Sequence, residues 1–170
     1  MALVVEDGSG SANANSYLSV ANADTYHTDH SASTTWSSAS TANKEKALRL
    51  ATQYLDAKYG RRWVGTRWSL DQALDWPRSY VVLYDIYTVS TSTVPQELKD
   101  ACAELALRQL TDTDLMPDLT NAFNISEEEV TAGSVSTRTK YVGGGKSQLK
   151  RYRLVEAILK RLIKTGVERA

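Results

Sequence analysis

The chain has 170 residues, of which 42% are hydrophobic and 24% charged, and its formal net charge is zero. This length suits one domain with a modest core, and the composition excludes collagen-like and wholly disordered proteins. A single cysteine, Cys102, excludes an internal disulfide framework, and the two histidines of the chain leave little for an ordinary zinc site. The sequence contains no apolar run long enough for a membrane span and no basic region of a signal peptide. We therefore expect a soluble protein of a reducing compartment.

The charges are segregated along the chain. Residues 138–170 contain ten Lys or Arg and two Glu, a net charge of +8, whereas residues 1–137 carry −8. Between Arg108 and Arg138 there is no basic residue. Such asymmetry is typical of an interaction tail, but solvated faces at both ends would give the same pattern. Both interpretations stay open.

The first elements in chain order are a loop and two helices. Residues 7–15 are rich in Gly, Ser and Asn and indicate a loop. Ser19 can cap a short helix that ends near His27. From Thr41 to Tyr59 apolar residues recur at helical spacing, which predicts an amphipathic helix that Gly60 ends.

The middle of the chain is less regular. Residues 61–94 contain three tryptophans and three tyrosines in turn-like sequence, and within them residues 81–89 predict a short extended segment. Pro95 opens a further helix that continues to about Thr111, because proline fits the first helical turn. Residues 112–129 predict an acidic loop.

The last third predicts an arm and a basic helix. Alternation in residues 130–142 indicates a strand or hairpin arm, the glycines at 143–145 indicate a hinge, and residues 151–164 place an apolar stripe on a helix with Lys and Arg on its other faces. We therefore expect a mainly α fold, a small helical bundle in residues 1–129, with an extended arm and hinge in residues 130–145 and a basic C-terminal helix and tail in residues 146–170. The expected core residues include Leu48, Leu55, Leu98, Cys102 and Leu105.

Motifs that could carry catalysis or cofactor binding fail on spacing. The Gly-Lys-Ser at residues 145–147 resembles the end of a phosphate-binding loop, but Lys140 stands where that loop needs a glycine. Residues 27–30 contain two histidines and an aspartate, which exposed side chains explain better than a metal site does. Cys102 lies far in sequence from any histidine that could act as its base. We expect no enzymatic activity, no cofactor and no metal.

Residues 59–68 interleave arginines with aromatic side chains, as proteins that bind single-stranded nucleic acids do. Bases stack on such rings at about 1–3 kcal/mol per base while the cations meet phosphates. The candidate nucleic-acid-binding residues are Arg61, Arg62, Trp63, Arg67 and Trp68. The alternative is a helix end pinned by its tryptophans. The acidic residues that follow would repel phosphates: Asp71, Asp75 and Asp85.

Several stretches together resemble one family. They are residues 5–10 (VEDGSG), 14–20 (ANSYLSV), 23–26 (ADTY), 44–48 (KEKAL), 51–56 (ATQYLD) and 72–78 (QALDWPR), followed by Val94-Pro95 at the start of an Ala/Leu-rich helix. The family is labelled DnaT-like single-stranded-DNA-binding, and its members are similar to the head–tail connector, or adaptor, proteins of long-tailed phages. The resemblance covers residues 4–110.

The resemblance implies a structural role in a virion. It implies a homo-oligomeric ring, commonly of twelve subunits, that binds the phage portal protein and a tail-side stopper or tail terminator protein. DNA would pass through the lumen without sequence-specific binding, no membrane would be involved, and the protein would lie at the neck of the virion after synthesis in the bacterial cytoplasm. The alternative function is a replication-type single-stranded-DNA-binding protein that uses residues 59–68.

Two groups of interface residues accompany the connector interpretation. The cations of the C-terminal segment are expected to meet the portal or an adjacent subunit: Lys146, Lys150, Arg151, Arg153, Lys160, Arg161 and Lys164. The arm is expected to face the tail or a neighbour through Val130, Val135 and Tyr141. For the apolar stripe of the C-terminal helix, burial in the chain's own bundle is the open alternative.

Overall fold

The computed structural model describes residues 2–84, 86–111, 114–116, 127–132, 135–140 and 151–164. The chain divides into two compact units, which we describe separately. The first unit comprises Met1–Leu115 and Tyr152–Ala170, and the second comprises Met116–Arg151.

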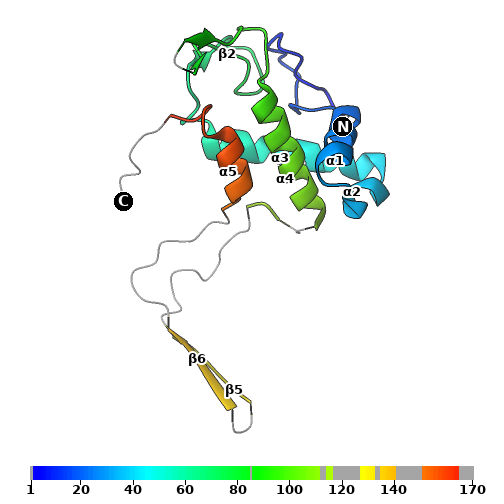
Figure 1. Cartoon of the computed structure of the whole chain (residues 1–170), viewed down its shortest axis with the longest axis vertical. Coiled ribbons are helices and arrows are strands. Elements are labelled where there is room, and N and C mark those ends of the chain that lie inside the picture. The colour runs from blue at the N-terminus through cyan, green and yellow to red at the C-terminus, as the bar shows by residue number, and fades with distance from the viewer. Residues whose placement is uncertain are drawn as a thin grey trace. The chain divides into compact units, whose positions relative to one another are not determined.

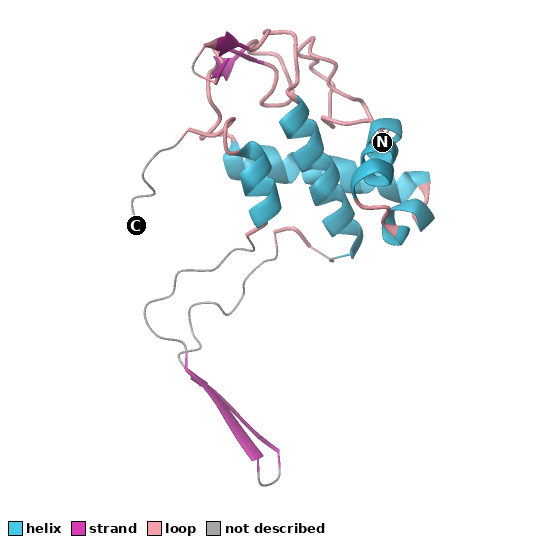
Figure 2. Ribbon diagram, viewed as in Figure 1, coloured by secondary structure: helices cyan, strands magenta, loops and turns pink. Residues whose placement is uncertain are grey.

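The first unit is a bundle of helices capped by irregular chain (Figures 1 and 2). Its helices are α1 (Val20–His30), α2 (Thr34–Ser38), α3 (Thr41–Tyr59), α4 (Gln96–Thr111) and α5 (Arg153–Leu159). Serine side chains begin the first three of them: Ser19, Ser33 and Ser40 each accept a hydrogen bond from a backbone N–H one turn into the helix. This is the usual N-cap, which satisfies a donor that has no intrahelical partner.

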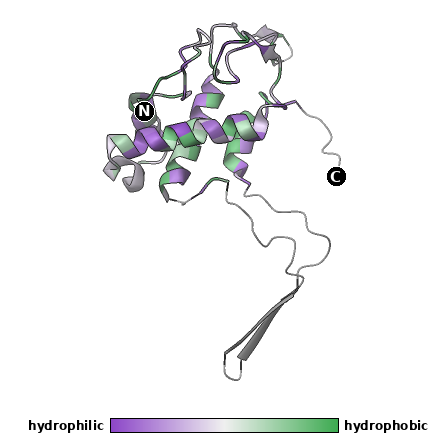
Figure 3. Ribbon diagram, turned by 180° about the vertical axis from the view of Figure 1, so that it is seen from behind, coloured by the Kyte–Doolittle hydropathy of each residue, from purple (hydrophilic) through white to green (hydrophobic). Residues whose placement is uncertain are grey.

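The core lies mainly between α3 and α4, and α5 packs against α4. Apolar and polar residues alternate around these helices, as amphipathic helices require (Figure 3). The expected core is confirmed, since all its named members are fully buried: Leu48, Leu55, Leu98, Cys102 and Leu105. The helices of the first unit also confirm the mainly α fold that the sequence predicts.

Two very short strand pairs cover one end of the bundle (Figure 2). In the first pair β1 (Thr66–Arg67) is antiparallel to β2 (Arg78–Ser79). In the second pair β3 (Val82–Leu83) is antiparallel to β4 (Tyr87–Thr88), within the segment predicted to be extended. The first pair and helix α2 were not predicted.

The C-terminal helix is shorter than predicted and ends at Leu159. The next residues leave the helix and pair with residues 62–64, because the N–H of Val64 donates to the carbonyl of Leu162 at 3.0 Å and the N–H of Lys164 donates to that of Arg62 at 2.7 Å. Leu162 is thereby buried from a non-helical position.

The apolar stripe of this segment is covered by the chain's own first unit. Val155, Leu159 and Leu162 are fully buried there, whereas Leu154 is 48% exposed. Burial in the chain's own bundle is therefore the correct one of the two alternatives for these three residues.

The second unit contains one hairpin, formed by β5 (Glu127–Ala132) and β6 (Val135–Lys140). The expected hairpin arm is confirmed, but it starts three residues earlier than predicted, inside the predicted acidic loop. The register sets Glu127 opposite Lys140 and Glu129 opposite Arg138, so the acidic end of the predicted loop belongs to the first strand of the hairpin. Val130 lies opposite Thr137, and Val135 opposite Ala132.

Candidate functional site

Large exposed side chains gather in the irregular cap of the first unit. Four aromatic residues of this cap are about half exposed or more, and we call them the aromatic surface: Trp68 (47%), Tyr80 (84%), Tyr84 (56%) and Tyr87 (65%). Exposed apolar side chains accompany them: Leu70, Val82 and Ile86. Apolar groups concentrated in one exposed region indicate a binding surface.

Strand pairing and one buried arginine fix the backbone of this surface. The N–H of Trp68 donates to the carbonyl of Pro77 at 3.4 Å, which continues the pairing of β1 with β2. The guanidinium of Arg78 donates to three backbone carbonyls, those of Val64 at 2.8 Å, Gly65 at 3.0 Å and Asp75 at 3.1 Å. Burying this charge is tolerated because each of its three nitrogens donates a hydrogen bond. The guanidinium thereby links residues 64–65 to Asp75.

The N-terminal loop packs against the ring of Trp68. The buried carboxylate of Glu6 accepts backbone N–H bonds from Gly8, Gly10 and Ser11 at 2.8–2.9 Å. Gly10 has a φ of 71°, and a Cβ there would lie 2.9 Å from Cε3 of Trp68. The indole therefore rests against a glycine that a larger residue could not replace.

Two tyrosines of the aromatic surface have a strained backbone. Tyr80 has a φ of 59° and Tyr84 a φ of 53°, in the left-handed region that most residues other than Gly and Asn avoid. Such strain costs about 1–2 kcal/mol per residue and persists mainly at functional sites. The two side chains are also largely exposed, so burial does not explain why tyrosine stands there.

Cations from two distant parts of the sequence lie beside this surface. The pairing of residues 62–64 with residues 162–164 brings the two segments together, and we call their four exposed cations the basic rim: Arg61, Arg62, Arg161 and Lys164. The guanidinium of Arg161 stacks on Tyr84, with Cζ 4.2 Å from the ring centroid. Its Nη1 also donates to the hydroxyl of Tyr84 at 2.7 Å.

The structure separates the candidates of residues 59–68 into two groups. Arg61, Arg62, Arg67 and Trp68 are exposed, and Arg67 donates a hydrogen bond to the carbonyl of Gln72. Trp63 is fully buried. Its ring lies 5.5 Å from that of Tyr59 and 6.0 Å from that of Trp76.

Trp63 therefore cannot stack on a base. Its burial could have been found from the sequence, because it follows Tyr59 by four residues and so continues the spacing of the inner stripe one turn past the end of α3. Tyr80, Tyr84 and Tyr87 were missed, and no local signal distinguishes them from buried tyrosines.

The remaining candidates are dispersed. Arg151, Arg153 and Lys160 are exposed near α5. Val130 and Val135 lie in β5 and β6. Tyr141, Lys146 and Lys150 lie outside the described residues, as do the glycines at 143–145. The structure thus joins Arg161 and Lys164 to the Arg61–Arg62 pair, two sets that the sequence assigned to different functions.

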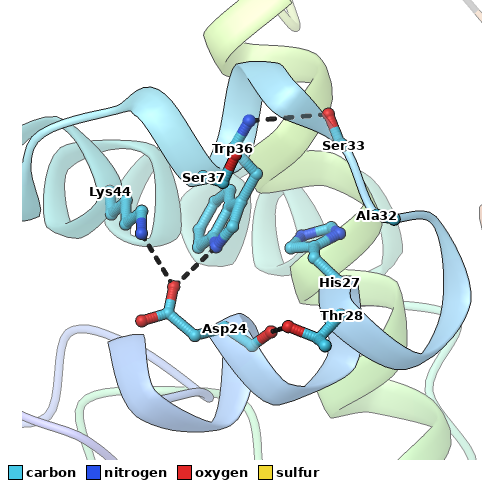
Figure 4. A pocket seen from close by; sticks show the side chains of 8 residues that line it. All are labelled: Asp24, His27, Thr28, Ala32, Ser33, Trp36, Ser37 and Lys44. Carbon is cyan, nitrogen blue, oxygen red and sulfur yellow. Dashed lines mark hydrogen bonds and ion pairs between the residues drawn. The ribbon is translucent and has the colours of Figure 1, made fainter.

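A pocket of about 370 Å³ lies between α1, α2 and α3 (Figure 4). In it Oδ1 of Asp24 accepts from Nζ of Lys44 at 2.9 Å and from Nε1 of Trp36 at 2.7 Å. His27 is buried; its Nε2 lies 3.2 Å from the carbonyl of Ala103 and its Nδ1 3.2 Å from Oγ of Ser31. Because a carbonyl only accepts, Nε2 carries the proton. These polar groups bind one another, and through Asp24 they link α1 to α2 and α3.

Other chemistry-bearing groups are also structural. Burial raises the pKa of the Cys102 thiol to about 12, which keeps it protonated. In the described part of the chain no three His, Cys, Asp or Glu residues are grouped so as to hold a metal ion. Within the same residues no helix is both long and apolar enough to cross a bilayer.

Comparison with known protein families identifies a family that matches the chain. The family model described as "Putative DnaT-like ssDNA binding protein" matches residues 1–170, which is the whole chain. No curated protein matches the chain, and no solved structure does.

This match corrects the interpretation of the chain as a phage head–tail connector, which is wrong. The family is described by single-stranded DNA, and no comparison supports a virion connector or a ring of twelve subunits. The same holds for the other expected partners, namely the portal protein, the stopper or tail terminator protein and DNA in a lumen. The portal interface also loses its physical basis, because the apolar stripe meant to dock there is buried in the first unit. The location in a virion and the absence of enzymatic activity stay predictions.

Proposed function

We propose that the chain, which belongs to the family of DnaT-like single-stranded-DNA-binding proteins, binds single-stranded DNA through the aromatic surface and the basic rim. The observation that carries the proposal is the position of four exposed aromatic rings in the same cap as cations from two chain segments. Single strands are bound by this combination, in which bases stack on rings and phosphates meet cations.

The chemistry favours single strands over duplexes. Every base has a π-face, so stacking on Trp68, Tyr80 or Tyr87 requires only that the base be free of its neighbours. Each such contact contributes about 1–3 kcal/mol, and each phosphate neutralised by a cation makes the affinity fall with salt. In a duplex the faces of the bases are already occupied, and only the phosphate contacts remain.

The acidic residues near residues 59–68 do not oppose this arrangement equally. Asp75 is half-buried, and a Cβ on Gly60 would lie 2.7 Å from its Oδ2, so its carboxylate lies against the end of α3. Asp71 is exposed and Asp85 lies outside the described residues. Among the described residues of the cap, the four cations of the basic rim therefore outnumber the one exposed carboxylate of this group.

Titration of the chain with a labelled oligothymidine, followed by fluorescence anisotropy, tests the proposal. We expect Trp68→Ala to weaken binding roughly tenfold or more, since it removes one stacking site. Leu154→Ala is the matched control, because Leu154 is equally exposed but lies on α5. A duplex of the same length should bind more weakly. Equal affinity of Trp68→Ala and the wild type for the single strand, or preference for the duplex, would contradict the proposal.

A further inference from the structure

The contact between Tyr84 and Arg161 joins the two parts of the site. Tyr84 stands at the turn between β3 and β4, and Arg161 follows α5, yet the guanidinium lies 4.2 Å from the ring centroid. Its Nη1 donates to the tyrosine hydroxyl at 2.7 Å. Both side chains are exposed, so neither is held there by burial in the core.

Stacking changes what each partner can do. A guanidinium over a ring covers the face that a base would need, so Tyr84 differs from the other members of the aromatic surface. A guanidinium has five N–H donors in one plane, and the hydroxyl of Tyr84 takes one of them. The exposed edge of the plane suits a phosphate, which arginine binds with two parallel hydrogen bonds.

Two features hold the pair in place before any ligand arrives. The backbone pairing of residues 62–64 with residues 162–164 fixes the segment that carries Arg161. The left-handed backbone of Tyr84, with a φ of 53°, fixes the direction from which the ring leaves the hairpin. An arginine whose orientation is already set loses less side-chain entropy when it binds.

We infer that Tyr84 is a positioning residue, which holds the guanidinium of Arg161 for a phosphate of the bound single strand, while bases stack on the other rings of the aromatic surface. This inference rests on the proposed function. It divides the site into a stacking part, made of Trp68, Tyr80 and Tyr87, and a phosphate contact made by one tyrosine–arginine pair.

A double-mutant cycle tests the division, with affinity for oligothymidine measured at several salt concentrations. Arg161→Gln should weaken binding roughly tenfold and reduce the salt slope by about 0.7, the value of one phosphate on a single strand. Tyr84→Leu should weaken binding in the wild-type background and have little further effect when Arg161 is already Gln, because the tyrosine acts only through the arginine. Arg161→Lys should keep the salt slope and lose part of the affinity, because lysine lacks the planar fork.

The controls separate failure of this inference from failure of the proposed function. Arg153→Gln removes an exposed cation at the other end of α5 and should leave the affinity nearly unchanged. Thermal unfolding of each variant checks that the fold is kept. If Tyr84→Leu weakens binding equally in both backgrounds, Tyr84 stacks on a base and the inference is wrong, although single-stranded DNA is bound. If the wild type does not bind oligothymidine, the proposed function and the inference both fail.

Discussion

The backbone N–H of Lys164 donates to the carbonyl of Arg62 at 2.7 Å. This bond and the neighbouring bond between Val64 and Leu162 align the end of the C-terminal segment with the chain that follows α3. The positive charge that the sequence concentrates after residue 138 is therefore placed, in part, beside the arginines at 61 and 62. This backbone pairing thus assembles the basic rim from two separate segments of the chain.

If the rim acts as one surface, its members should be interchangeable in their effect on salt dependence. Arg61→Gln and Lys164→Gln should each reduce the slope of log affinity against log salt by about 0.7, and together by about twice that amount. Both residues are exposed, so the free energy of unfolding of each variant should stay within about 0.5 kcal/mol of the wild-type value. A slope that changes with one variant only would show that the rim is not continuous.

The helices were predictable because their determinants are local. The apolar spacing from Thr41 to Tyr59 and the proline before Gln96 set the two central helices, and both were found with correct bounds to within a residue or two. The predicted core followed from the same spacing. Helix α2 was missed because five residues are too few for a periodic pattern.

The candidate site was predictable only in part, because it depends on tertiary contacts. Trp63 and Trp68 lie in the same arginine-rich stretch, yet one is fully buried and the other is 47% exposed. Strands of two residues carry no alternation that could reveal them. A left-handed tyrosine is contrary to its local preference, so the positive φ of Tyr80 and Tyr84 could not be predicted from the turn-like sequence around them. The pairing of Lys164 with Arg62 joins segments that no spacing rule connects.

Strain at Tyr80 predicts a conflict between stability and binding. Asparagine adopts the left-handed conformation more readily than tyrosine, and the side chain of Tyr80 is 84% exposed. Tyr80→Asn should therefore raise the free energy of unfolding by about 1 kcal/mol while weakening the binding of oligothymidine. Urea denaturation measures the first effect and anisotropy the second. Tyr87→Asn is the control: Tyr87 is similarly exposed but is not left-handed, so no gain in stability is expected.

The packing of α4 predicts a large effect of a single truncation. Leu105 is fully buried in the core, so Leu105→Ala should lower the free energy of unfolding by about 2–5 kcal/mol. Leu154→Ala removes the same atoms from a side chain that is 48% exposed and should cost much less. Denaturant midpoints of the two variants make the comparison. Similar midpoints would mean that α4 does not present this face to the core.

Stability should depend on pH through Asp56, which lies beneath the cap. Its Oδ1 accepts from the hydroxyl of Tyr17 at 2.5 Å and its Oδ2 from the N–H of Asp75 at 3.2 Å. Burial raises its pKa from 3.8 to about 7, so between these values the folded chain keeps a proton that the unfolded chain has lost. The free energy of unfolding should then fall as the pH rises from about 4 to about 7.

The variant Asp56→Asn isolates this contribution, because it cannot ionise. Burial lowers the pKa of His27, which works in the opposite direction, since the unfolded chain then binds the extra proton and stability rises with pH. The difference between wild type and variant removes that effect, because His27 is present in both. Urea denaturation at pH 5 and pH 8 should show a larger loss of stability with rising pH in the wild type than in Asp56→Asn. Equal pH dependence of the two proteins would show that Asp56 is ionised in the folded chain throughout this range.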